Sequence, residues 1–433
     1  MHPRRQVLPF GPAARHAGLA SIAAASLATI PALVAAQQPT KAPATPSAAA
    51  PASAGLAAGF ESAWGLQPEQ RALPARREAA QAQARAARAW TPEPPALELS
   101  AKSDRLNKNA GTREYGAGVS VPVWLPGERG RAGELAEAES RVVDSRLGAA
   151  RLRLAGQVRE AWWNWQRARI ESDVARDQLD NARRLAGDVA RRTKAGDLAR
   201  ADQHQADGAV ASAESSVAQS RAALAAAALH FRGLTGLQPD ASVAAEAEPA
   251  ADAGIADAHP TLQELKDRAA VADRSAVLAS TRSRANPEVV LATTRDRVAF
   301  SEPYAQTLTL GVRIPFGGGP RHDSRVASAR AEVIELQAQL ALERARLQAE
   351  HEAARARVEA GRAQLAAAGR RERLARETRG FFEKSFRLGE TDLPTRLRIE
   401  AEAAEAERQA ARARIELAAS VSALRQALGL LPQ

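Results

Sequence analysis

The sequence predicts a mainly helical fold with a membrane β-barrel part, and three observations support this prediction. An apolar heptad repeat runs without a break from Leu147 to Val189, and a neighbouring stretch alternates apolar and polar residues. Both patterns occur twice, once in each half of the 433 residues. Sustained heptads are typical of coiled coils, and a period of two is typical of strands with one apolar face. We therefore expect tandem-duplicated long coiled-coil helices and two β-hairpins per chain.

The amino-terminal segment is expected to be removed on export. In residues 1–36, basic residues precede an apolar stretch, and Ala36 ends a small-residue cleavage site, as in a secretory signal. The alternative is an uncleaved anchor, but the apolar stretch is short and Ala-rich against the ~20 residues that a span requires. Residues 37–54, rich in Pro, Ala, Ser and Thr, read as a linker. The chain has no Cys, which excludes disulfides and an amino-terminal lipid on Cys.

Two hairpins of membrane length are expected after a first helix. This helix should run from Pro68 to Ala89 with an interruption at Pro74, and a proline-rich segment stops it. The alternating stretches are close to the ~9–11 residues of a tilted strand that crosses a bilayer. The predicted strands are residues 97–102, 115–125, 289–293 and 304–316, with turns at 107–114 and 295–303.

Aromatic residues lie at both ends of the predicted hairpins. Trp124 and Phe316 are at one end, and Tyr115 and Tyr304 are at the other. Such a distribution fits the aromatic girdles of a membrane barrel, with ordinary strand-end aromatics as the alternative.

The long helix is expected to begin after Pro126 and to end near Lys194. At about 1.5 Å rise per residue, the segment from Ala132 to Lys194 would form a rod about 95 Å long. No globular core requires a helix of that length. Its heptad seam consists of Leu147, Leu154, Ala161, Ala168, Ala175, Ala182 and Val189.

The second half of the chain repeats this seam at a constant offset of 193 residues. Pro122, Gly196 and Gly236 have counterparts at the same offset. A period this long indicates two large copies rather than an array of small repeats. The second seam consists of Leu340, Leu347, Ala354, Gly361, Ala368, Ala375 and Phe382.

Each long helix is expected to turn back at a glycine. A glycine between a basic and an acidic residue is typical of a helix C-cap followed by a helix N-cap, so each break is a hairpin tip. The returning helices should cover residues 199–232 and 394–427, with an irregular acidic connector over 238–258 between the copies. The tip residues are Lys194, Gly196, Asp197 and Leu198 in the first copy, and Arg387, Gly389, Glu390 and Leu393 in the second.

Neither catalysis nor metal binding is indicated, and we expect a protein that is not an enzyme and has no cofactor. There is no Gly-rich phosphate loop, and the histidines are dispersed without metal-ligand spacing. The pair His322-Asp323 favours an exposed turn over a metal site, and Trp162, Trp163 and Trp165 favour helix packing over a ligand platform. The net charge is +10, but Arg and Glu alternate along helices, which favours a solvated helix face over a nucleic-acid surface.

Four amphipathic strands cannot close a barrel. An open sheet edge in lipid leaves backbone groups unpaired at several kcal/mol each, so several chains must contribute to one barrel. Three chains supply twelve strands, and the Gly, Ser and Thr residues of the inner face suit a water-filled lumen.

The ordered set of elements resembles the TolC-like outer-membrane efflux protein family. Each copy has a hairpin ending in Val-Ser-Val-Pro-Val or Val-Arg-Ile-Pro-Phe, a heptad helix, a Gly-centred tip and a closing helix that ends near Leu237 or Leu430. The resemblance covers residues 56–430, with repeats at 55–237 and 259–430. The Gly-Asp-Leu of the first tip and Asn286-Pro287 are similar to the branch associated with heavy-metal efflux.

The resemblance implies a homotrimer in the outer membrane, with a twelve-stranded barrel that continues as an α-helical barrel through the periplasm. It implies that the tips meet a periplasmic adaptor (membrane fusion) protein, which joins the duct to an inner-membrane pump of RND type. It places the pore entrance just past each tip, at Asp202 in the first copy and at Thr395, Arg396 and Arg398 in the second. The second copy is basic, which departs from a wholly acidic entrance, so we expect ion pairs between Asp202 and the basic residues of the other copy in place of a carboxylate ring. The alternative is that Asp202 only caps or solvates the first turn of its own helix.

The predicted function is passive export of metal ions or small toxic compounds through an outer-membrane exit duct. The outer-membrane component of a type I protein secretion system is the alternative within this class. A soluble periplasmic coiled-coil adaptor or scaffold is the alternative from another class. An adaptor would have one coiled-coil hairpin between compact domains, whereas this sequence has two membrane-length hairpins at matching places.

Overall fold

The computed structural model describes residues 53–240, 246–250, 253–317 and 319–433. The predicted secretory signal and all but the last two residues of the predicted linker lie outside the described residues. From residue 53 onward, the described part belongs to one compact unit.

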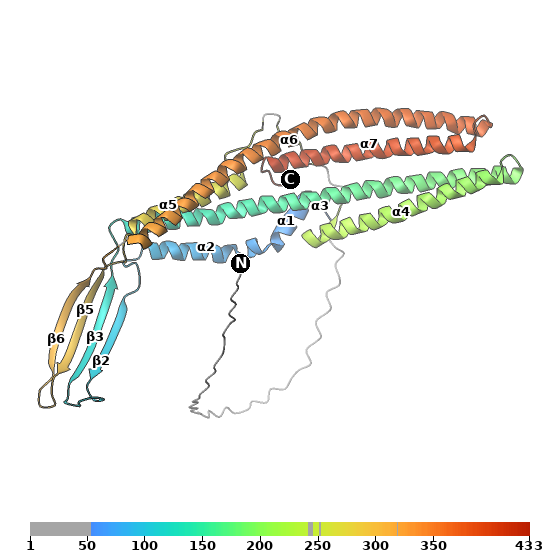
Figure 1. The fold of residues 1–433 in the computed structure, drawn as a ribbon. Helices are drawn as coiled ribbons and strands as arrows, with labels where there is room; N and C mark the ends of the chain where they lie inside the picture. Colours follow the sequence, from blue (N-terminus) through green and yellow to red (C-terminus); the bar gives the residue numbers. More distant parts are fainter. Residues whose placement is uncertain (1–52, 241–245, 251–252, 318) are drawn as a thin grey trace, which may run out of the picture. The chain divides into compact units, whose positions relative to one another are not determined.

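Two long helical hairpins confirm the predicted duplication. In Figure 1, α3 lies beside α4 and α6 lies beside α7, with a turn at the far end of each pair. Shorter helices pack along the other halves of the long ones, α1 and α2 on α3, and α5 against both α3 and α6. The helices are α1 Leu56–Leu66, α2 Pro68–Ala87, α3 Glu128–Ala195, α4 Arg200–Thr235, α5 Pro260–Thr281, α6 Gly319–Leu388 and α7 Leu393–Ala427.

The predicted interruption at Pro74 is wrong, because α2 continues through this residue. Pro74 lies early in the helix, where the loss of one backbone hydrogen bond leaves the later turns intact. Helix α1 was not predicted. It is anchored by Phe60 and Trp64, whose side chains are buried against α3.

The four long strands form one antiparallel sheet in the order β2-β3-β5-β6, so the two hairpins lie side by side. Val119 of the first hairpin pairs with Leu291 of the second. The outer edges of β2 and β6 have no partner strand within the described chain. The strands are β2 Ala96–Ser103, β3 Arg113–Pro122, β5 Glu288–Arg297 and β6 Ala305–Arg313. A short parallel pair, β1 Ser53–Ala54 with β4 Gln238–Pro239, lies apart from this sheet.

Strand boundaries differ from the prediction by a few residues. β3 ends at Pro122, which has no N–H to continue a ladder, whereas the strand was expected to reach Leu125. β5 continues to Arg297 because β3 extends to Arg113 and pairs with it, so the expected turn from Arg295 begins later.

Glu128 ties the two copies together where the strands pass into the helices. Its carboxylate is fully buried and accepts hydrogen bonds from the Leu125 N–H (3.0 Å), Arg282 Nε (2.6 Å) and Asn286 Nδ2 (2.6 Å). The Val123 N–H donates to the Pro287 carbonyl at 2.7 Å. Asn286-Pro287, which suggested the heavy-metal branch, therefore has a structural role at this junction.

The heptad seams face inward, as predicted. Leu154, Ala161 and Val189 of α3 are buried, as are Leu347 and Ala354 of α6. The tryptophan cluster of α3 packs with aromatic side chains of α1 and α4, and the ring centroids of Trp162 and Phe231 lie 5.6 Å apart. This confirms that the tryptophans serve helix packing.

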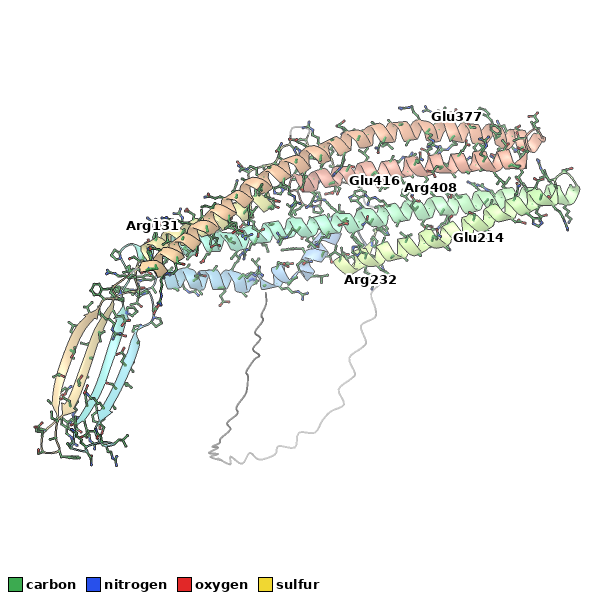
Figure 2. All side chains as sticks on the ribbon, viewed as in Figure 1. Arg131, Glu214, Arg232, Glu377, Arg408 and Glu416 are labelled. Atoms are coloured by element: carbon green, nitrogen blue, oxygen red, sulfur yellow. The ribbon has the colours of Figure 1, made fainter. Side chains whose placement is uncertain are left out.

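Most charged residues of the helices lie on solvated faces, and Glu128, Arg159, Arg396 and Arg425 are buried exceptions. Figure 2 shows Glu214, Arg408 and Glu416 along the helical hairpins, with neighbouring charged side chains around them. Arg183 pairs with Glu214 at 2.8 Å and Arg167 with Glu416 at 2.6 Å, all four well exposed. Exposed pairs of this kind contribute about 0–1 kcal/mol each, so packing rather than surface charge stabilises the hairpins.

A buried ion cluster fixes the connector to both copies. Glu246 of the connector has a side chain only 1% exposed, and its carboxylate contacts Arg159 of α3 at 2.7 Å and Arg425 of α7 at 3.2 Å. The hydroxyl of Ser422 also donates to this carboxylate. Residue 246 thereby joins the first long helix to the last helix through charges that are removed from water.

Replacement of Glu246 by Ala should destabilise the protein by about 3–5 kcal/mol, because two arginines would remain buried without their carboxylate. Glu248→Ala is the matched control, since Glu248 lies on the same connector in a partly exposed pair with Arg362. Chemical denaturation of the detergent-solubilised protein measures both. Equal unfolding midpoints for the two variants would contradict the structural role of the buried cluster.

Candidate functional site: the hairpin tips and the entrance beside them

The first tip has the glycine cap that the sequence predicted. Gly196 has a φ of 91°, in the left-handed region that favours glycine. Its N–H donates to the Thr193 carbonyl at 3.1 Å, and the Asp197 N–H donates to the Arg192 carbonyl at 2.9 Å. This pair of bonds forms a Schellman motif. A Cβ at Gly196 would meet no atom within 4 Å. Glycine is therefore favoured here by the positive φ of the backbone, and lack of space for a side chain is not the reason.

The second tip repeats this geometry. Gly389 has a φ of 80°, and the Glu390 N–H donates to the Ser385 carbonyl at 3.0 Å. Asp392 then caps α7, because its carboxylate accepts the Thr395 N–H at 3.2 Å. Hydrogen bonding from Thr395 lowers the pKa of Asp392, which keeps this cap ionised.

The charged tip residues remain on the surface. Lys194 and Asp197 are exposed at the first tip, and Arg387 and Glu390 are exposed at the second. Each tip thus presents one basic and one acidic side chain beside a bare glycine backbone. Leu198 is half-buried, in contact with a small core between the two tips.

That core, here the tip cluster, consists of Val189, Ala206, Phe386 and Leu393, all buried. Leu393, predicted as a docking residue, is only 1% exposed. It therefore supports the tip from inside. The tip cluster contains residues from α3, α4, α6 and α7, so it holds the two hairpins together at their ends.

Arg192 adds a polar link across the same contact. Its guanidinium donates to the Phe386 carbonyl at 2.8 Å and to the Arg387 carbonyl at 2.9 Å. Its Cζ also lies 4.9 Å from the centroid of the Phe386 ring. Carbonyls at a helix C-terminus carry partial negative charge and favour a cation. One arginine of the first copy thus donates to two carbonyls at the end of α6, and the Phe386 carbonyl also accepts the Gly389 N–H at 3.2 Å.

The candidate entrance residues have partners within their own hairpins. Asp202 accepts the Ala199 N–H at 3.0 Å, so its carboxylate caps the start of α4. Arg396 is buried and pairs with Glu400 at 2.5 Å, and Arg398 pairs with Glu402 at 2.8 Å. No ion pair joins Asp202 to either arginine within the described residues. Within the single chain, the polar contact that joins the two copies at the tips is made by Arg192 and the end of α6.

The roles of Arg192 and Phe386 in the contact between the tips were not predicted from the sequence. Phe386 lies four residues after the seam position Phe382, so the heptad could have indicated a buried residue there. Arg192 carries no such signal, because its acceptors are backbone carbonyls of a distant helix. Polar contacts to backbone atoms leave no residue pattern that a sequence shows.

Comparisons with known proteins agree with this architecture. Residues 61–237 match the family described as outer membrane efflux protein. No curated protein sequence matches the chain significantly. The matched segment begins within α1 and ends just after α4, so it covers the first hairpin of strands and the first helical hairpin.

Solved outer-membrane channels have the same fold. VceC of Vibrio cholerae is 18% identical, with a TM-score of 0.69 over 86% of this chain and 96% of that chain. CusC is 18% identical, with a TM-score of 0.71 over 87% of this chain and 92% of that chain. MtrE of Neisseria gonorrhoeae, solved in an open state, is 15% identical, with a TM-score of 0.65 over 87% and 89%.

Replacement of Arg192 by Ala should loosen the contact between the tips. Loss of a charge-assisted hydrogen bond costs about 1.5–3 kcal/mol, so the ratio of open to closed channels should rise by roughly tenfold or more. Single-channel recording of the reconstituted protein measures this ratio. Arg191→Ala is the control, since Arg191 pairs with Asp188 on its own helix. Indistinguishable open probabilities for Arg192→Ala and the parent would show that this contact does not hold the tips together.

Proposed function

We propose, from the match of residues 61–237 to the outer membrane efflux protein family and from the fold, that this chain forms the outer-membrane exit duct of a tripartite efflux system. The duct lets metal ions or small toxic compounds pass from the periplasm to the exterior without chemical change. The observation that carries the proposal is the pairing, twice in one chain, of a membrane-length hairpin with a long helical hairpin.

The sheet supports a trimeric barrel. Its edge strands β2 and β6 expose unpaired backbone groups, which in lipid cost several kcal/mol each. Pairing of β6 with β2 of a neighbouring chain would satisfy them, and three chains would close a twelve-stranded barrel. The outer face is apolar and open to a bilayer, with Leu99, Leu308 and Leu310 at least 73% exposed.

The helices also have surface that suits neighbouring subunits. α6 exposes Ile334, Leu342, Leu374 and Phe381, each at least 59% exposed in the single chain. Large apolar side chains in such numbers along one helix are typical of a protein interface. A helical barrel of three chains would cover them with the helices of the next subunit.

The tips support docking of a periplasmic adaptor, which would connect the duct to an inner-membrane pump of RND type. Both tips end in a glycine with no atom within 4 Å of a Cβ position, so the backbone there is open to a partner. Each glycine has exposed charges of both signs beside it, which suits recognition of an adaptor hairpin.

The entrance residues Asp202, Thr395, Arg396 and Arg398 would lie just inside these tips. Their partners within each hairpin suit a role in ion preference, because Asp202 and Arg398 keep fixed positions on the surface while Arg192 holds the tips. In the single-channel recordings, Asp202→Asn should reduce the preference for cations without raising the open probability. An unchanged ion preference would show that Asp202 does not line the entrance.

Bulk at the tip glycines should abolish efflux while the trimer and its outer-membrane level stay normal. Gly196→Asn and Gly389→Asn are the decisive variants, because Asn tolerates positive φ and so adds a side chain with little backbone strain. Gly208→Asn, at an exposed position of α4 with open space, is the control. Growth of a deletion strain that carries pump and adaptor, in the presence of the exported compound, measures efflux. Normal resistance in both tip variants would refute docking at the tips.

A further inference from the structure

One group of residues at the loop end of the sheet serves neither the duct wall nor the tips. This group, the loop-end cluster, lies on the apolar face of the sheet, at the end farthest from the helices. It consists of Arg113 and Tyr115 of β3, Arg295 and Arg297 of β5, and Tyr304 next to β6.

The register and the side-chain contacts place the cluster on one face. Arg113 pairs with Arg297 and Tyr115 with Arg295 across β3 and β5, so these four side chains point to the same side. The guanidinium carbons of Arg295 and Arg297 lie 4.9 and 4.8 Å from the Tyr304 ring centroid. The Tyr115 and Tyr304 rings are 6.4 Å apart. Arginines stacked on aromatic rings form an ordered basic surface.

The loops behind the cluster hold it in position. Arg297 Nε donates to the Gly111 carbonyl at 3.2 Å, and the Thr112 hydroxyl donates to the Val298 carbonyl at 2.9 Å. Gly111 has a φ of 100°, and a Cβ there would lie 2.4 Å from the Phe300 nitrogen. The two hairpin loops therefore pack directly on each other, and the arginines project from a fixed backbone.

The positive charge of the cluster is not neutralised by the chain. Within the described residues, none of the three arginines has a carboxylate within ion-pair distance, and the buried Nε of Arg113 has no hydrogen-bond partner. The acids of the two paired strands, Glu114 and Asp296, face the opposite side of the sheet, where Glu114 pairs with Lys102 at 3.6 Å. At the loop end of the sheet, the apolar face of the described strands therefore carries only basic charges, whereas the opposite face carries both basic and acidic side chains.

Apolar residues adjoin the cluster on the same face. Leu99, Val119, Leu291 and Leu308 are 40–75% exposed there. A face that changes along the strands from apolar side chains to arginines matches the change from acyl chains to phosphates in an anionic bilayer leaflet. Free phosphate has no acyl chain that could contact these apolar side chains.

We propose that the loop-end cluster binds the phosphate group of an anionic lipid headgroup in the outer leaflet. The inference rests on the proposed function, because it requires the apolar face of the sheet to meet lipid. Arginine suits this ligand, since its planar fork donates paired hydrogen bonds to phosphate oxygens. Three chains would carry three such sites around the barrel.

The test compares lipid retention by the purified trimer. The protein is placed in nanodiscs of phosphatidylcholine with a small fraction of phosphatidylglycerol, and native mass spectrometry counts the phosphatidylglycerol molecules that stay bound. Arg295→Gln, at an exposed position, should weaken retention about fivefold, as expected for one basic side chain beside an anionic surface. The triple variant with Arg113→Gln, Arg295→Gln and Arg297→Gln should abolish selective retention. The corresponding triple Lys variant should retain the lipid better than the Gln variant but less well than the parent, because lysine keeps the charge and lacks the planar fork.

Lys102→Gln is the matched control, because Lys102 lies at the same end of the sheet but on the lumen face. Retention in Arg295→Gln equal to that in the parent and in Lys102→Gln would overturn the lipid site while the trimer remains intact. Competition by millimolar inorganic phosphate as strong as by phosphatidylglycerol would also overturn it, in favour of a free anion. A parent protein that does not enter nanodiscs as a trimer would instead overturn the proposed function on which the site rests.

Discussion

Unpaired backbone groups at the two edges of the sheet impose the constraint on which the rest of this structure depends. A strand edge is tolerable in water, but in a bilayer each free N–H or C=O costs several kcal/mol. β2 and β6 present such edges on either side of the four strands. In the proposed function the apolar face of these strands meets lipid, and pairing with other copies of the chain would satisfy the two edges. The helices of such an assembly would follow the symmetry of its strands, because each hairpin of strands leads into a long helix.

Besides the β3–β5 ladder and the packing of α5 on α3, three local contacts join the two copies, and different physical interactions act at each. Glu128 connects them where strands become helices, through hydrogen bonds to backbone and side chains. Glu246 connects α3 to α7 near the middle of the chain's helical part, through buried charges. At the tips the contact is a small apolar cluster with a single arginine. The contact at the tips thus depends mainly on apolar packing, and in the proposed function it lies at the end of the duct that has to open.

The fold was largely predictable because its signals are periodic. Heptads in α3 and α6, alternation in β3 and β6, and glycines at positive φ each follow from local geometry, and all were read at the same offset in both copies. The interruption predicted at Pro74 was wrong because a proline near the start of a helix disturbs fewer backbone hydrogen bonds than one in the middle. The junction at Glu128, the buried role of Glu246 and the contact of Arg192 could not be predicted, because their partners are distant in sequence and partly backbone. The cap formed by Asp202 at the start of α4 was one of two interpretations of that residue, whereas the pairing of Arg396 and Arg398 within their own helix was not predicted.

The number of chains in the particle extracted from the outer membrane tests whether β2 and β6 of neighbouring chains pair to close one barrel. Sedimentation equilibrium in a density-matched detergent gives the protein mass without assumptions about shape. We expect three chains per particle and no soluble form in the absence of detergent. A monodisperse single chain that stays in solution without detergent would contradict it, because the edges of β2 and β6 would then be exposed to water and no barrel would form.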